Sequence, residues 1–447
     1  MIGNPSSQGR PSPGASSRMD AGRLSGLTIL RFAHVCGEGG GMERYLLDLN
    51  RALGERNQLT TVQLELAYDR DQLMERTEVH NGCRLTKIPL LVEPVIATAE
   101  HQDSLATKWK AWVVNRVFCA WPVYEIFTRS YISRRRVPRS PGEPKGAGLK
   151  IREIIKRFGA DLIVLHSSGG ADASEIIEVA RAENIPVALV HHFSNDRLTG
   201  LSLRQQISQV DGVAGVCAVD VPPYLRNRYC NLSDGIDTEF YRRENAGPLS
   251  KNYSHPILFL PARIIHSKGQ ADLIKIAAIL KQRGIRTTVV FAGRIDSPSF
   301  EIELREMAAR EGMAADVEFV GQLNPEQLRD WFAAAKVMVF PTYHHEGLPR
   351  ILMECQAMGL PPVAYEIGGT SEGLLNKKTG FLIPLGGWES MAQVVETLLA
   401  NESLRSNLGR VGRQFVEQKF SLRALAERHE DFYLKILPAH RRNSVAS

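Results

Sequence analysis

The chain has 447 residues, of which 43% are hydrophobic and 23% charged, and it is too long for one ordinary core, so we expect two or three domains. No apolar run reaches the ~18 residues of a membrane-spanning helix. The net charge of +6 is uneven, because Thr107 to Arg157 holds 13 Lys and Arg against three Glu and the rest of the chain sums to about −4. The basic character therefore belongs to one segment and does not indicate a nucleic-acid-binding protein.

Cysteines and the N-terminus indicate the compartment. The cysteines show no CxxC pair, which argues against a disulfide framework or zinc site and favours a reducing, cytoplasmic compartment. They are Cys36, Cys83, Cys119, Cys217, Cys230 and Cys355. Residues 1–26 are rich in Ser, Gly, Pro and Arg without an apolar core, so we interpret them as a disordered leader rather than a secretory signal, and Met19 could be the true start.

The first structural unit begins with an apolar strand at Leu27–His34. A glycine loop ending in Gly40 and Gly41 follows, then apolar residues at helical spacing up to Leu53, with Gly54 as the expected C-cap. Such a strand–loop–helix unit brings backbone N–H groups to an anion or polar ligand. A tight turn without a ligand explains this segment alone equally well.

Further strands predict two α/β units of the parallel, doubly wound class. In the first unit they are expected at 60–66, 162–165, 187–190 and 212–216. The second unit follows a linker near 240–254 and has strands at 257–260, 287–292 and 317–320. Its helices are expected at 270–283, where Gly284 ends the helix, and at 325–335, where Asn324 is the N-cap. We place the domains at 27–245 and 255–420, facing a central cleft.

Two carboxylates eight residues apart, Glu346 and Glu354, are the most informative feature. The apolar run 337–340 predicts a strand, Glu346 falls in the following loop and Glu354 in a helix. Ligands of open α/β sheets bind at the carboxyl ends of the strands. Ionised carboxylates there suit the hydroxyl groups of a sugar or ribose.

The residues around these carboxylates resemble the donor-site motif of retaining glycosyltransferases of family 4. Three stretches follow in family order: Pro261-Ala262-Arg263 to Lys268-Gly269, then Glu346-Gly347-Leu348-Pro349-Arg350 with Glu354, then Gly368-Gly369. Ala262 replaces a usual glycine, and Cys355-Gln356 is a mild departure. The resemblance covers about 255–437 and implies the GT-B fold, with a last helix, 421–437, that crosses back to the first domain.

The resemblance implies roles for these residues. Arg263 and Lys268 would hold the donor diphosphate and stabilise its growing charge, so that no metal or other cofactor is needed. Glu346 would contact the donor sugar and Glu354 the ribose. The backbone at Gly347, Leu348 and Pro349 would add donor contacts, as would the loop at Gly40 and Gly41.

A histidine is expected near the reacting centre. His191 and His192 follow the predicted strand at 187–190, and His192 matches the family's donor-sugar histidine best, although His191 is not excluded and His166 is a weaker candidate. Asp69 and Asp71 form a D-x-D triplet, which we interpret as structural rather than metal-binding.

The segment at about 105–145 departs from the family's common core. Aromatic residues such as Trp112 and Trp121 are mixed with basic ones and followed by Arg134-Arg135-Arg136. Aromatic residues with a basic flank suit a peripheral contact with anionic membrane. An amphipathic helical hairpin packed on the first domain explains the same pattern equally well.

The sequence thus predicts a cytoplasmic, metal-independent, retaining glycosyltransferase. It would move a sugar from a nucleotide-sugar donor to a glycan or lipid-linked acceptor, in cell-surface polysaccharide or lipopolysaccharide synthesis, with no nucleic-acid partner. The alternatives are a sugar-nucleotide epimerase, a phosphorylase of similar fold and a catalytically silent glycan-binding or scaffold protein.

Overall fold

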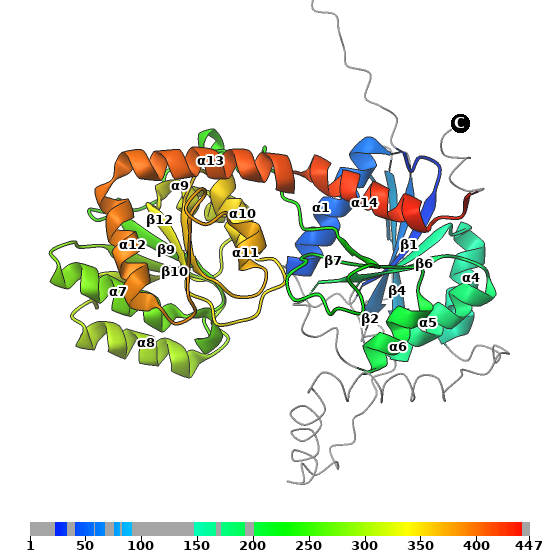
Figure 1. The fold of residues 1–447 in the computed structure, drawn as a ribbon, viewed down its shortest axis with the longest axis horizontal. Helices are drawn as coiled ribbons and strands as arrows, with labels where there is room; N and C mark the ends of the chain where they lie inside the picture. Colours follow the sequence, from blue (N-terminus) through cyan, green and yellow to red (C-terminus); the bar gives the residue numbers. More distant parts are fainter. Residues whose placement is uncertain are drawn as a thin grey trace, which may run out of the picture.

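The structure is a computed structural model that describes residues 23–33, 41–57, 59–67, 76–80, 83–91, 147–166, 171–192 and 201–439. Two parallel-type sheets, each covered by helices, form two α/β bodies that lie side by side, with helices α13 and α14 running from one to the other (Figure 1). This is the predicted fold class.

The first sheet has the strand order β3-β4-β2-β1-β5-β6-β7-β8, parallel throughout except for the antiparallel pair β3–β4. Its strands are β1 Thr28–Ala33, β2 Thr60–Ala67, β3 Arg76–His80, β4 Cys83–Leu91, β5 Leu162–His166, β6 Val187–His191, β7 Gly212–Gly215 and β8 Tyr229–Asn231. Its helices are α1 Gly41–Arg56, α4 Ala147–Phe158, α5 Ala171–Ala182 and α6 Leu201–Gln209.

Alternation along the strands divides the apolar core of this sheet into two layers. Ile29, Val164 and Ala188 pack with residues of α1 and α14, whereas Leu30 and Ile163 pack with residues of α4, α5 and α6. Because successive side chains of a strand point to opposite faces, both faces of the sheet are covered, as expected for a doubly wound sheet.

The second sheet is parallel in the order β11-β10-β9-β12-β13-β14. Its strands are β9 Ile257–Pro261, β10 Thr288–Ala292, β11 Val317–Phe319, β12 Val337–Phe340, β13 Pro362–Tyr365 and β14 Phe381–Ile383. Its helices are α7 Gln270–Gln282, α8 Pro298–Arg310, α9 Pro325–Ala334, α10 Arg350–Ala357, α11 Thr370–Gly373, α12 Trp388–Ala400 and α13 Glu402–Phe420, and short 3₁₀ turns lie at η3 Arg243–Asn245 and η4 His266–Lys268. The strand order reverses between β9 and β12, and such a switch point is the usual ligand position in this class of fold.

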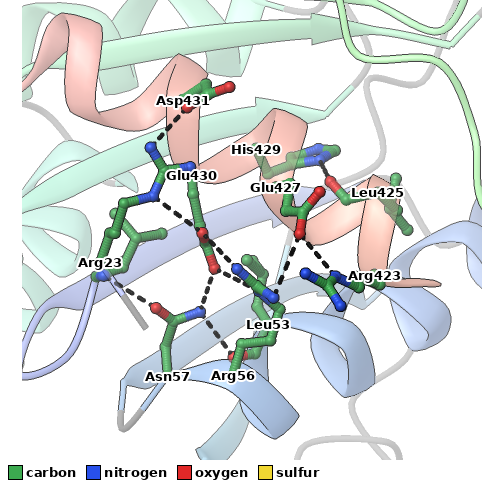
Figure 2. Close-up of polar contacts among 11 residues, drawn as sticks. Arg23, Leu53, Arg56, Asn57, Arg423, Leu425, Glu427, His429, Glu430 and Asp431 are labelled. Atoms are coloured by element: carbon green, nitrogen blue, oxygen red, sulfur yellow. Dashed lines mark hydrogen bonds and ion pairs between the residues drawn. The ribbon is translucent and has the colours of Figure 1, made fainter. Parts of the chain in front are cut away.

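The last helix, α14 (Leu422–Ile436), follows α13 after the single residue Ser421 and packs on α1 of the first domain (Figure 1). Glu430 of α14 accepts hydrogen bonds from Arg56 Nε at 3.0 Å, Asn57 Nδ2 at 2.9 Å and Arg23 Nε at 3.3 Å (Figure 2). The chain therefore crosses back to the first domain through a buried carboxylate surrounded by Arg56 and Asn57 of that domain and by Arg23, which lies within the segment predicted as a disordered leader.

Two local expectations need correction. Helix α1 does not end at Gly54 but continues to Arg56, because packing against α14 outweighs the cost of about 1 kcal/mol for a glycine within a helix. The hairpin of β3 and β4 was not predicted, although Asn81-Gly82 between these strands is a typical hairpin turn sequence.

Candidate functional site

The candidate site lies at the switch point of the second sheet, where the chain leaves β9 and β12. The turn η4 and the start of α7 follow β9, and the loop 341–349 and α10 follow β12. Since β9 and β12 are parallel neighbours, these two connections meet at one edge of the sheet. Arg263 and Lys268 fall in the first connection, and Glu346 falls in the second.

Hydrogen bonds fix the loop after β12 to the connection after β9. Tyr343 N donates to Ser267 O at 2.8 Å, and the hydroxyls of Tyr343 and Tyr365 donate to Asp272 Oδ2 at 2.6 and 2.7 Å. Burial and the bond to Asp272 raise the pKa of Tyr343, so its phenol keeps the proton that it donates. The loop that carries Glu346 is therefore held in place before any ligand arrives.

Close backbone contacts allow no side chain at three glycines around this loop. A Cβ at Gly269, whose φ is +74°, would lie 1.9 Å from Pro341 O, and one at Gly369 would lie 1.5 Å from Gly347 O. At Gly368, with φ +51°, it would lie 2.6 Å from Glu346 O. Only glycine fits these positions, so the backbone at Glu346 and Gly347 is held by direct contact with Gly368 and Gly369.

Lys268 and Glu346, predicted from separate motifs, form an ion pair between Nζ and Oε1. The side chains of Lys268 and Glu346 are 10% and 23% exposed, so the pair is largely screened from water but keeps some accessible surface. A lysine ammonium has three donors and a carboxylate has about four acceptor positions, so both groups keep capacity for a ligand.

Arg263 lies in the same connection but is more open. Its side chain is 51% exposed, and Nη1 contacts Asp296 Oδ2 at 2.7 Å. Asp296 also pairs with Arg294 at 2.6 Å. The hydrogen bond from Arg294, together with the hydrogen bond and charge of Arg263, lowers the pKa of Asp296, although burial opposes this. Because exposed ion pairs are weak, Arg263 can turn to another anion at little cost.

Glu354 lies one turn into α10 and is 2% exposed. Its Oε1 lies 3.8 Å from Arg350 Nε of the same helix and 3.8 Å from Arg44 Nη1 of α1 in the first domain. Burial raises the pKa of Glu354, against the opposing charges of Arg350 and Arg44 and a bond with Tyr241. The predicted ribose contact is thus enclosed by groups of both domains.

Pro349 occupies the N-cap position of α10, and Leu348 is buried at 8% exposure. The predicted donor-contacting segment at Gly347–Pro349 therefore leads directly into the helix that carries Glu354. Here the peptide N–H groups of the first turn favour an anion or a hydroxyl oxygen.

The predicted histidine follows β6 in the first domain. His192 Nε2 lies 3.0 Å from His166 Nδ1, and the His192 ring stands edge-on to Tyr45 at 4.6 Å between centroids. His191 is 1% exposed, whereas His192 keeps partial exposure. His192 is accordingly the one of the pair that a ligand can reach, and His166 is its hydrogen-bond partner.

Three predicted features lie outside the described residues: Gly40, the triplet of Asp69 and Asp71, and the insertion at 105–145. Gly41 is described and is the first residue of α1.

Sequence reasoning missed the groups that join the two domains at this site. Four charged residues converge around Glu354: Arg44 and Asp48 of α1, Asp234 of the segment after β8 and Arg350 of α10. Arg350 stood in the quoted motif without a role. The available signal for Asp48 was a carboxylate between Tyr45 and Ala52, which lie three and four residues away on the same face of the helix and are buried.

In the part of the chain that the structure describes, no group of three His, Cys, Asp or Glu residues is arranged to hold a metal ion. Among the same residues, no helix combines the length and the apolar character needed to cross a bilayer.

Comparison with known families identifies the second domain. Residues 242–415 match the family described as Glycosyl transferases group 1. The predicted resemblance of this domain to glycosyltransferases is confirmed.

Two curated relatives are similar over part of their length. The capsular polysaccharide biosynthesis glycosyltransferase CapM of Staphylococcus aureus is 26% identical over 214 residues, which cover 45% of this chain and 53% of CapM. The GDP-mannose-dependent alpha-(1-6)-phosphatidylinositol monomannoside mannosyltransferase of Mycobacterium tuberculosis is 27% identical over 233 residues, 47% of this chain and 60% of that protein. The chain spans little more than half the length of these relatives.

Among solved structures, the chain is similar to a glycosyltransferase from Rickettsia africae. The TM-score is 0.65 at 16% identity, and the match covers 92% of this chain and 99% of the other. At this identity the likeness concerns the fold, and the predicted GT-B fold is confirmed.

Proposed function

Since residues 242–415 belong to the glycosyl transferases group 1 and the chain has the GT-B fold, we propose that this protein is a retaining, metal-independent glycosyltransferase that uses a nucleotide-sugar donor. The observation that carries the proposal is the ion pair of Lys268 and Glu346 at the switch point of the second sheet. A cation for phosphate and a carboxylate for hydroxyls lie side by side where such folds bind their ligands.

The donor diphosphate would contact Lys268 and Arg263. Lys268 is held by Glu346 and is 10% exposed, so its charge acts in surroundings of low polarity, where it is stronger than in water. As the sugar leaves, the diphosphate gains negative charge, and a cation fixed beforehand stabilises that state more than the ground state. In this proposal the two cations take the place that a metal ion has in other transferases.

The carboxylates and the histidine would hold the sugar and ribose. Glu346, which is 23% exposed, would accept hydrogen bonds from donor-sugar hydroxyls. Glu354 would accept hydrogen bonds from the ribose hydroxyls after the Arg44 side chain has moved away from it. His192 would approach the sugar from the first domain. The acceptor would attack the same face that the diphosphate leaves, with a donor phosphate oxygen taking its proton.

The acceptor is proposed from the relatives. One relative makes capsular polysaccharide and the other mannosylates a phosphatidylinositol mannoside, so we propose a glycan or lipid-linked glycan of the cell surface, modified on the cytoplasmic side. The basic, aromatic segment at 105–145, which lies outside the described residues, would supply a peripheral contact with anionic lipid. Neutralising Arg134, Arg135 and Arg136 would then weaken binding to anionic vesicles without changing nucleotide-sugar binding.

The rival functions require other groups. An epimerase needs acid–base carboxylates in the first domain, and a phosphorylase needs a lysine for pyridoxal phosphate. A silent glycan-binding protein needs neither the phosphate cations nor the ion pair of Lys268 and Glu346. The proposal accounts for these groups together.

The test is a thermal-shift screen of nucleotide sugars, followed by transfer of labelled sugar from those that bind. We expect Lys268→Ala and Glu354→Gln each to reduce turnover at least ~100-fold in folded protein, since each removes a charged contact to the donor. Lys336→Ala is the matched control, because Lys336 is exposed and precedes β12, at the opposite edge of the same sheet. Equal turnover in all three variants would refute the donor site, and binding without turnover in the wild type would favour the silent glycan-binding protein.

A further inference from the structure

Arg350, the first residue of α10, joins three parts of the molecule. Its Nη2 donates to Asp48 Oδ2 of α1 at 2.5 Å, and its Nη1 donates to Asp234 Oδ1 at 2.7 Å and to Gly235 O at 3.0 Å. The donor-site helix of the second domain is thereby tied to α1 and to the segment between β8 and the second sheet.

These contacts are largely withdrawn from water. The side chains of Arg350, Asp48 and Asp234 are 12%, 21% and 6% exposed. Burial alone would lower the pKa of Arg350, but the carboxylates of Asp234 and Asp48, with Glu354, raise it, so the guanidinium stays charged. Removing one carboxylate leaves a half-paired buried charge, which costs more than losing a surface ion pair.

The same arginine bounds the predicted ribose contact. Glu354 Oε1 lies 3.8 Å from Arg350 Nε and 3.8 Å from Arg44 Nη1, so one carboxylate touches a cation from each domain. Movement of α1 relative to α10 therefore changes the surroundings of Glu354.

We infer that Arg350, Asp48 and Asp234 form a latch, the Arg350 latch, that sets the arrangement of the two domains for transfer and makes Asp48 a positioning residue. The inference rests on the proposed function, because the donor would be held on the second domain and the acceptor approached from the first. Reacting atoms must come within about 3–3.5 Å in a defined orientation, so an error in domain arrangement lowers the rate of transfer more than the affinity for the donor.

A second cross-link from α1 provides an internal comparison. Arg51 Nη1 pairs with Asp237 Oδ2, but the Arg51 side chain is 52% exposed, and this pair ends on the segment after β8 rather than on α10. Loss of the Arg51–Asp237 pair removes another ion pair of α1 without changing a contact of the donor-site helix. It therefore separates the latch from a general effect of losing an ion pair of α1.

The experiment compares Asp48→Asn, Asp237→Asn and the wild type by kinetics and by small-angle X-ray scattering. For Asp48→Asn we expect kcat to fall at least tenfold, with less than a threefold change in the affinity for the nucleoside diphosphate and an increased radius of gyration. Asp237→Asn should match the wild type in all three measurements, and Asp48→Glu, which keeps the carboxylate, should recover most of the lost kcat.

Should Asp48→Asn fail to fold, Arg350→Lys takes its place, because an ammonium keeps the charge but not the fork that reaches both carboxylates. The latch is overturned if Asp48→Asn, or that replacement, behaves as Asp237→Asn does in kcat and scattering. The proposed function fails separately, if the wild type transfers no sugar from any nucleotide sugar. In that case scattering and nucleoside-diphosphate titration of the same variants still decide whether the latch sets the domain arrangement.

Discussion

Glu430 offers a sharp test of how the last helix is held on the first domain. Its side chain is fully buried and accepts from Arg56 Nε at 3.0 Å and Nη2 at 3.3 Å, from Asn57 at 2.9 Å and from Arg23 at 3.3 Å (Figure 2). In Glu430→Gln the carboxylate becomes an amide, and the two arginines lose their buried counter-charge. Breaking a buried ion pair costs about 3–5 kcal/mol, but Arg56 and Arg23 are 25% and 48% exposed and can partly return to water, so we expect about 2–4 kcal/mol.

Glu427, on the same helix, is the matched control. It pairs with Arg423 at 2.9 Å and with Arg56 at 3.5 Å, but its side chain is 40% exposed, so Glu427→Gln should cost about 0–1 kcal/mol. Native-state hydrogen exchange of the α14 amides measures the free energy of local opening, and urea unfolding measures the global effect. A difference of less than about 1 kcal/mol between the two variants would refute the assignment of Glu430 as the main polar anchor.

The pH dependence of this effect has a definite sign. Burial raises the pKa of Glu430, but the hydrogen bonds of Arg56 and Asn57 and the charges of Arg56 and Arg23 outweigh it, so the pKa is lowered from 4.5. The stabilisation by Glu430 is therefore complete above that value and is lost as the pH falls through the folded-state pKa. The stability difference between the wild type and Glu430→Gln should shrink accordingly below about pH 4.5.

Three further predictions concern the site and its surroundings. Transfer should survive EDTA, because in the proposed donor site Lys268 and Arg263 would supply the positive charge at the diphosphate. Activity lost in EDTA and restored by Mg²⁺ or Mn²⁺ would contradict this. Gly369→Ala should weaken nucleotide-sugar binding at least ~tenfold, since the new Cβ would lie 1.5 Å from Gly347 O, whereas Gly373→Ala, whose nearest contact is 3.4 Å, should leave it nearly unchanged. Burial raises the pKa of Asp234 to about 6, although Arg350 opposes this. Ionising Asp234 therefore costs folded-state stability as the pH rises from about 4 to about 6. The stability of the wild type relative to Asp234→Asn, measured by urea unfolding, should fall over that range, and a constant difference would contradict the raised pKa.

Elements with local signals were predictable from sequence. Asn324 caps α9, and its side chain and that of Gln327 form a reciprocal capping box, as the Asn-Pro start indicates. Gly284 has φ +81° just beyond the last turn of α7, where only a residue tolerant of the left-handed conformation ends a helix well. Glu346 was indicated by the continuous apolar run of the strand before it, whereas Lys268 was indicated by the resemblance to family 4.

The interdomain contacts had no such local signal. Asp48, Asp234 and Arg350 are separated by more than a hundred residues each, and nothing in the sequence around them indicates that they meet. The same is true of Glu372, which accepts from Val219 N at 2.8 Å and from Asn231 Nδ2 at 2.7 Å across the domains. Contacts of this kind depend on how two folded bodies dock, which periodicity and capping cannot specify.

The residues around His192 indicate whether it can take the proton of the acceptor. The His192 ring stands edge-on to Tyr45, whose hydroxyl in turn contacts His429. His429 Nδ1 lies 2.9 Å from Leu425 O, which can only accept, so Nδ1 carries the proton and Nε2 accepts from the Tyr45 hydroxyl at 2.8 Å. Burial lowers the pKa of His429 to about 3, and burial with His191 lowers that of His192 to about 3, so both rings are neutral at physiological pH. A ring with so low a pKa is a poor base for an acceptor hydroxyl but a good hydrogen-bond partner for a sugar. This favours the proposed chemistry, in which His192 positions the donor sugar and the proton passes to an oxygen of the departing diphosphate.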